Sequence, residues 1–360
     1  MVVAGVAVLC CLPALASALP VGVPGLTPRQ LETRILGSQR LSFSGYAESN
    51  ATFGLPPLPV FSSVTPLLDG VTRMRVWQAA PDHWRVDTLS DTGENDTYQV
   101  GDDTYVWDSG EQLLTGIYGT ETIRLPRAAD LVPSALAYRL ISWAGPGASI
   151  GLLPPRRVAG QSAAGLAVSP ASAQSTIARA DIWASPSTGL PLLVELFGRT
   201  SPQPALSTQF LEAAPWTPDN SVLTPQLGPG TGFTSTTPSS FSGVLKNLAE
   251  KRMPRHLAGF RRGRSPAPQI YVYGSGLTGF AVLIFPPSSG GQLLGDAVNA
   301  GAQQLTFPDG AGAAASAPLI NLVLVQSYGS PDTMLLVGFV TKTVLEEAAA
   351  ELAARPDFGP

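Results

Sequence analysis

From residue 40 onward, apolar and polar side chains alternate with a period of two. The stretch TRMRVWQ places Met74 and Val76 on one face, HWRVDTL does the same with Trp84 and Val86, and RLSFSGYAE begins the pattern with Phe43. Because successive side chains of a β-strand point to opposite faces, each stretch predicts a strand with one dry and one solvated face. Short turns between such stretches predict an antiparallel meander, either flat or curled.

Composition supports this reading. The chain holds 37 Gly and 34 Pro, and only 13% of its residues are charged. Soluble domains average about 25% charged residues, so many turns and strands are expected in place of long helices. A length of 360 residues favours two domains. The net charge of −4 gives no reason to expect nucleic acid or an anionic membrane surface as a partner.

Two segments interrupt the alternation. Residues 53–70 are too apolar for a solvated loop and too rich in proline for a helix, so we expect them to cover an apolar surface. Residues 126–143 predict one helix, or two short ones around Pro133. Their apolar stripe consists of Leu131, Ala135, Leu136, Leu140 and Trp143.

The stretch 213–240 has the Pro, Gly, Ser and Thr content of a linker, which predicts a first domain over 25–212 and a second over 241–357. In the second domain the pattern predicts a hairpin over 270–285 and a helix near 292–303. A strand pair and a closing helix follow, over 319–327, 333–340 and 342–354.

Residues 1–18 form an uncharged apolar run that ends in Ala16-Ser17-Ala18, which is typical of a cleaved signal peptide and predicts an exported protein. The run has no basic residues at its start, which a translation start upstream of Met1 would explain. The alternative is an uncleaved membrane anchor of marginal length. Both cysteines, Cys10 and Cys11, lie inside it. A cleaved chain would therefore have no thiol to serve as nucleophile, metal ligand or disulfide partner.

Two literal catalytic motifs lack their structural context. Gly274 to Gly279 spell G-x-G-x-x-G, but a six-residue β-favouring run and two prolines follow where a nucleotide site needs a helix. We therefore predict a hairpin with a glycine turn. Ser149 is the centre of a G-x-S-x-G, but a helix precedes it and the one histidine that follows in the chain is His256. A glycine-rich turn is the simpler interpretation, and we expect no catalytic activity.

Metal sites are also not expected. The chain has two histidines, His83 and His256, so a zinc or iron site would consist almost wholly of carboxylates. The acidic clusters GDDTY and SDTGEND lack the alternating ligands of a calcium loop and are interpreted as solvated turns. No cofactor is predicted.

Basic residues gather before the second domain. Between residues 246 and 264 lie Lys251, Arg252, Arg255, Arg261, Arg262 and Arg264. This segment either contacts an acidic partner or a lipid phosphate, or is a solvated approach to the second domain.

The order of these pieces resembles the MucB/RseB group, regulatory proteins of extracytoplasmic sigma-factor signalling whose large domain shares the fold of the LolA lipoprotein carriers. In the first domain the similar stretches are GDDTYVWD (101–108) and DIWASPSTGLPLLVELFGR (181–199). In the second they are MPRHLAGF (253–260), VYGSGLTGFAVLIF (272–285) and LLVGFVTKTVLEEAAAEL (335–352). The proline-rich stretch 53–70 and the low charge depart from the group.

The resemblance implies an α+β, mainly β fold: a curled antiparallel sheet, an incomplete barrel with a helical lid, followed by a small α+β domain. It also implies a hydrophobic groove for acyl chains. We expect the groove to be lined by Phe43, Met74, Val76, Trp84, Val86 and Val194, with a lid that includes Phe53, Leu55, Leu58 and Phe61. The alternative is a core that these side chains fill completely.

The implied function is a non-catalytic extracytoplasmic protein that senses a lipid or lipoprotein and regulates a membrane-bound anti-sigma factor. One alternative is a lipid or lipoprotein carrier of the cell envelope. Another is an envelope structural protein that binds a protein partner and no ligand.

Overall fold

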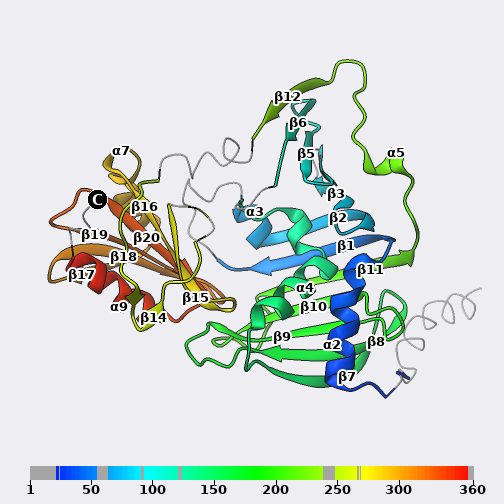
Figure 1. Ribbon diagram of the computed structural model, residues 1–360, viewed down its shortest axis with the longest axis horizontal. Coiled ribbons are helices and arrows are strands. Elements are labelled where there is room, and N and C mark those ends of the chain that lie inside the picture. Colours follow the sequence, from blue (N-terminus) through cyan, green and yellow to red (C-terminus); the bar gives the residue numbers. More distant parts are fainter. Residues whose placement is uncertain are drawn as a thin grey trace, which may run out of the picture.

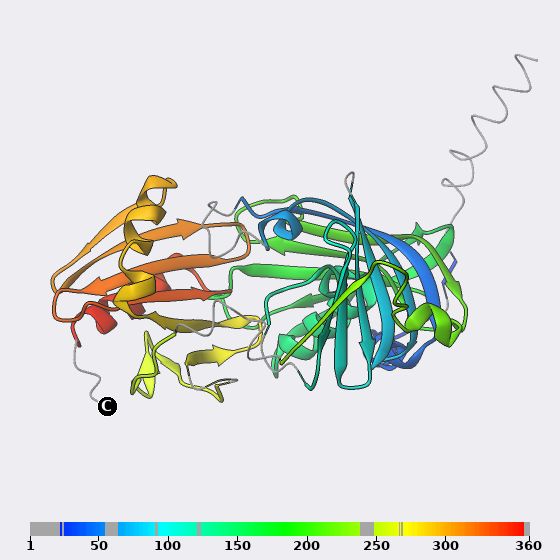
Figure 2. The same ribbon diagram turned by 90° about the horizontal axis from the view of Figure 1, so that it is seen from above.

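Two domains, each built on a β-sheet, make up the computed structural model (Figures 1 and 2). The structure describes residues 22–23, 25–54, 64–90, 93–120, 124–237, 248–265, 267 and 269–355. The predicted signal peptide, 1–18, lies outside these residues. Among the described residues, no helix combines the length and the apolar character that crossing a bilayer requires.

The first domain contains a twelve-stranded, strongly curled sheet whose linear strand order leaves β12 and β7 as free edges (Figure 2). Its neighbouring strands are antiparallel, except that β12 runs parallel to β6. The predicted mainly β fold with an open, curled sheet is confirmed. The strands are β1 (Phe43–Thr52), β2 (Asp69–Ala80), β3 (His83–Ser90), β4 (Gly93–Val100), β5 (Asp103–Asp108), β6 (Leu113–Ile117), β7 (Ser149–Val158), β8 (Gln161–Ser169), β9 (Ile177–Ala184), β10 (Pro191–Gly198), β11 (Leu206–Pro215) and β12 (Gly232–Thr236).

Helices α2 and α4 pack side by side across one face of this sheet (Figure 1). Helix α2 begins with a capping box, in which Thr27 and Gln30 satisfy each other's backbone N–H groups. The predicted helical segment divides at Pro133 into η3 and α4, because proline is accepted in the first turn of a helix. The helices of this domain are α2 (Pro28–Gly37), η1 (Ser38–Arg40), α3 (Thr65–Leu68), η3 (Ala128–Leu131), α4 (Pro133–Ala144) and α5 (Asn220–Leu223).

The core of the first domain lies between the helices and the predicted dry face of the strands. Val76 of β2 pairs with Val86 of β3, so both side chains point to the same side. Phe43 contacts Phe210 edge to face, with ring centroids 5.6 Å apart. Leu31 of α2 is fully buried against this layer.

The predicted linker carries short regular elements at three places. Residues 213–215 end β11, α5 packs on β3, and β12 extends the sheet beyond β6. Leu223 of α5 is 1% exposed. This stretch is therefore part of the first domain's surface, and the domain limits stay a prediction.

The second domain is a six-stranded sheet in the order β15-β16-β20-β19-β18-β17, with α9 packed on β19. The predicted hairpin, strand pair and closing helix are confirmed. The hairpin β17–β18 was not predicted, since its small residues show no alternation. The elements are β13 (His256–Leu257), β14 (Phe260–Arg261), β15 (Ile270–Ser275), β16 (Thr278–Phe285), α7 (Pro287–Gly290), α8 (Leu293–Asn299), β17 (Gln303–Phe307), β18 (Gly310–Ser316), β19 (Asn321–Ser327), β20 (Thr333–Gly338) and α9 (Lys342–Ala353).

Candidate functional site

A cavity of about 320 Å³ lies between the helices η3 and α4 and the strands β2 and β3. Its floor is the apolar face of the two strands, and α4 forms its roof. It is lined by Gln39, Val76, Gln78, Pro81, Trp84, Val86, Arg124, Ala129, Asp130, Val132, Ser134, Ala135, Tyr138, Arg139, Ser142 and Trp143.

The six residues predicted to line a groove fall into two groups. Val76, Trp84 and Val86 line the cavity. Phe43, Met74 and Val194 are no more than 1% exposed and pack within the core beyond it. Strand alternation identifies the face of the sheet, but it does not tell which positions on that face have a helix pressed against them.

Of the predicted lid, Phe53 is buried and joins the core of the first domain. Leu55, Leu58 and Phe61 lie outside the described residues. The cover seen over the cavity is η3 and α4. Their predicted stripe is divided: Leu131, Leu136 and Leu140 enter the core, whereas Ala135 and Trp143 face the cavity.

An ionic group stands at one wall of the cavity. Asp130, which is 7% exposed, accepts two hydrogen bonds of 2.6 and 2.7 Å from Arg124 and one of 2.7 Å from Arg139. Burial alone would raise the pKa of Asp130, but the hydrogen bonds and charges of the two arginines outweigh it and lower the pKa to about 2. The group therefore stays ionised, with two cations around one anion. Sequence analysis missed it, because the three residues lie on separate elements.

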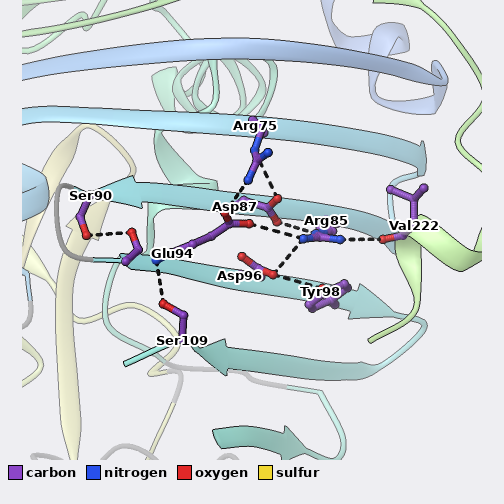
Figure 3. Close-up of polar contacts among 10 residues, drawn as sticks. Arg75, Arg85, Asp87, Ser90, Glu94, Asp96, Tyr98, Ser109 and Val222 are labelled. Atoms are coloured by element: carbon purple, nitrogen blue, oxygen red, sulfur yellow. Dashed lines mark hydrogen bonds and ion pairs between the residues drawn. The ribbon is translucent and has the colours of Figure 1, made fainter. Parts of the chain in front are cut away.

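A second ionic cluster occupies the opposite, outer face of the same strands (Figure 3). Arg85 donates to Asp87 at 2.5 Å and to Asp96 at 2.9 Å, and Arg75 pairs with Glu94 at 2.5 Å. Asp87 and Asp96 are 0% and 4% exposed. Burial raises the pKa of Asp87 to about 7 and that of Asp96 to about 6, against the opposing effect of Arg85.

Helix α5 lies beside this cluster, and Val222 accepts a 3.5 Å hydrogen bond from Arg85 (Figure 3). The interpretation of SDTGEND as a solvated turn is thus wrong for Glu94 and Asp96, which belong to β4 with Asp96 buried. The three carboxylates present oxygens within 4.8 Å of one another. Two arginines offset two of the three carboxylate charges, and the raised pKa of Asp87 and Asp96 allows a proton to offset the third. The arrangement therefore suits an ionic network better than a bound cation.

The basic segment of the second domain has an exposed portion. Arg252, Arg255, Arg261 and Arg264 are exposed and have no ion-pair partner among the described residues. The other two predicted residues are engaged: Lys251 pairs with Asp332, and Arg262 donates to the carbonyl of Met253 at 2.7 Å. Arg262 is exposed as well, but its side chain is held by this carbonyl. Arg252, Arg255, Arg261 and Arg264, all within 252–264, are called the arginine face below.

The two catalytic motifs are not assembled as active sites. Ser149 is the first residue of β7, so it does not stand on a strand-to-helix turn. The motif Gly274–Gly279 forms the end of β15, a turn at Gly276 and Leu277, and the start of β16, which confirms the predicted hairpin. His83 contacts the side-chain oxygen of Asn220 at 3.1 Å, and His256 lies in β13 of the other domain.

Comparison with solved structures gives this architecture a precedent. MucB in complex with MucA(peri) superposes with a TM-score of 0.50 at 19% identity, covering 89% of this chain and 97% of MucB. The chain has a MucB-like fold. The MucA/MucB complex of Pseudomonas aeruginosa gives a TM-score of 0.50 at 20% identity, covering 89% of this chain and 96% of that one. At this identity the likeness establishes the fold alone.

A LolA superfamily protein from Nitrosomonas europaea covers 56% of this chain at 10% identity, with a TM-score of 0.26. No protein-family model and no curated protein matches the sequence.

Proposed function

We propose that this protein is a non-catalytic extracytoplasmic binding protein that holds an acyl chain of a lipid or lipoprotein in the cavity under α4. The observation that carries the proposal is the cavity itself, which has an apolar floor of Val76, Trp84 and Val86 and a roof made by one helix. Ligand sites are usually concave and apolar, with a few polar groups that fix orientation. Arg124, Asp130 and Arg139 are such groups.

The size of the cavity narrows the ligand. Its volume of about 320 Å³ is at the lower end of the roughly 300–1,000 Å³ that is usual for ligand pockets. One acyl chain fits this space better than a complete lipid with several chains. We therefore infer that a single chain enters while the head group stays at the mouth, near Arg139 and Tyr138.

We further propose that the second domain binds an acidic segment of a protein partner through the arginine face. Exposed arginines without internal partners are available for bidentate contacts with carboxylates. MucB, which shares the fold, has been seen in complex with MucA(peri). The partner class is accordingly a membrane-bound anti-sigma factor, and the function is regulation of an envelope-stress pathway. A simple carrier has no need of such a face, so the arginine face favours the regulator.

The ligand part is tested by extracting lipid from the purified protein for mass spectrometry and by titrating it with cis-parinaric acid, a fluorescent fatty acid. We expect saturable binding. Absence of both bound lipid and probe binding would refute the acyl-chain proposal and favour an envelope protein that binds a partner alone.

The partner part is tested with the extracytoplasmic domain of an anti-sigma factor encoded beside this gene. Changing Arg255, Arg261 and Arg264 together to Glu should weaken binding and remove its dependence on salt. Changing Arg29, Arg40 and Arg157 of the first domain together to Glu serves as the charge-matched control, since all three are exposed. Equal loss in both variants would show a general effect of net charge and contradict a specific face.

A further inference from the structure

The tip of the hairpin β15–β16 is buried in the other domain. Leu277 is 1% exposed and packs with the core of the first domain, although its strands belong to the second. Its backbone N–H donates to the carbonyl of Trp143 at 3.0 Å, and its own carbonyl accepts from the Ser175 hydroxyl at 2.5 Å. The hairpin tip therefore joins the two domains at the C-terminal end of α4.

Gly276 makes this approach possible. It has a φ of +55°, and a Cβ added there would lie 2.0 Å from the carbonyl oxygen of Trp143. Any side chain would force α4 and the hairpin apart. The close approach of Trp143 is therefore a second reason for glycine at position 276, in addition to the positive φ of the turn.

The contact also completes a helix. The last four carbonyls of an α-helix have no donor within the helix, and Trp143 lies in the last turn of α4, just before Gly145 ends it. Leu277 supplies one of the missing donors. The second domain is therefore a cap for the helix that roofs the cavity.

The rest of the interface combines apolar packing with directional bonds. Leu319 is buried in the core of the first domain, with Ile320 and Phe339 packed against it. Thr176 donates its hydroxyl to Leu319 at 2.5 Å and its backbone N–H to Phe339 at 3.0 Å. The N–H of Thr341 donates to Gln174 at 2.8 Å. A set of such bonds between backbones is lost together when the domains shift by an ångström or two, because hydrogen bonds weaken steeply with distance and angle.

The same turn of α4 meets the cavity. Tyr138, Arg139, Ser142 and Trp143 line it, so a ligand in the cavity would touch Trp143, whose carbonyl accepts the hydrogen bond from Leu277. The floor is a packed sheet, whereas the roof is α4 with the short helix η3 beside it. A chain that needs more room than the present cavity must therefore displace α4.

We propose that occupancy of the cavity and docking of the second domain are negatively coupled through α4, so that an acyl ligand releases the hairpin tip. This inference rests on the proposed ligand for its physiological meaning. Coupling is reciprocal: what weakens the hairpin contact must tighten ligand binding by the same factor. The fold thereby gives a route from a lipid site to the domain that bears the arginine face.

One test follows hydrogen exchange of the Leu277 amide by mass spectrometry of peptides covering 274–279, without ligand. Ala135→Trp together with Val76→Phe fills the cavity from its roof and its floor at once, beyond the single added ring that it accepts. We expect faster exchange at 274–279 than in Val76→Phe alone, and unchanged exchange in β19. Unchanged exchange at 274–279 in the folded double variant overturns the coupling, whether or not the protein binds lipid.

The reciprocal test measures cis-parinaric acid binding to Leu277→Ala, for which we expect affinity about tenfold tighter than wild type, a typical size for coupling between sites. Leu283→Ala is the matched control, because Leu283 lies in the same hairpin but packs within the second domain. Equal affinity of wild type, Leu277→Ala and Leu283→Ala for the probe would overturn the coupling but not the proposed ligand. If no protein binds the probe, the proposed ligand is wrong, and the exchange experiment decides the coupling.

Discussion

Replacing Val76 by Phe distinguishes an open cavity from a filled core. Val76 is 2% exposed and borders a cavity of about 320 Å³, which is room for roughly ten water molecules at their volume in the liquid. The added ring atoms need less space than this, so we expect a change of less than about 1 kcal/mol in the free energy of unfolding. The ring would occupy the position of the ligand, and probe binding should fall at least tenfold.

Val194→Phe is the matched control. Val194 has the same side chain and was predicted for the same groove, but it is fully buried between Ile182 and Thr208 and does not border the cavity. Overpacking there should cost about 1–3 kcal/mol. In a domain of this size that lowers the melting temperature by about 3–10 °C. Calorimetry and a cis-parinaric acid titration of both variants supply the measurements.

Equal loss of stability in the two variants would show that Val76 lies in a filled core and would refute the open cavity. A stable Val76→Phe protein that binds the probe as well as wild type would refute the ligand position, because the ligand would have to occupy another place.

Three further predictions concern the ionic groups and the hairpin tip. Burial raises the pKa of folded Asp87 to about 7, above its ordinary value near 4. The free energy of unfolding should therefore fall as pH rises from about 4 to 7, and Asp87→Asn should lose most of that slope in melting curves. The pH dependence due to Asp130 has the opposite sign, because its lowered pKa of about 2 stabilises the fold above pH 4. We expect Asp130→Asn to lower the free energy of unfolding by about 2 kcal/mol at pH 7 and to remove part of the acid sensitivity below pH 4. Equal loss of stability at pH 3 and pH 7 would contradict the pairing with Arg124 and Arg139. Gly276→Ala should destabilise more than Gly259→Ala, because both glycines have positive φ but only Gly276 faces a carbonyl; equal melting temperatures would show that the tip does not dock.

Local signals explain what the sequence predicted well. The period of two fixed which side of β2 and β3 is apolar, and Pro133 marked where a helix begins, since both depend on a few adjacent residues. Helix α2 was not predicted, because its ten residues include only two fully buried side chains, Leu31 and Ile35, which are too few to show an apolar stripe.

Long-range contacts explain most of what was missed. The outer face of β3 reads as solvated, yet Asp87 is fully buried. Its neighbours Arg75 and Asp96 belong to other strands, and α5 comes from a stretch that has the composition of a linker. Similarly, the cavity forms where α4 crosses only part of an apolar face. No property of Val76 or Val194 alone indicates which of them lies beneath the gap.

The glycine motif 274–279 depends both on local signals and on a long-range contact. Its local meaning was predictable: a strand follows Gly279, so a nucleotide site is excluded and a hairpin expected. A two-residue turn with positive φ at its first central position requires one glycine, and this is Gly276. The remaining constraint comes from Trp143, in another domain, whose carbonyl lies where a side chain would begin. A pattern that resembles a phosphate-binding loop is therefore explained by a backbone contact between domains, and that contact is what links the roof of the cavity to the domain with the arginine face.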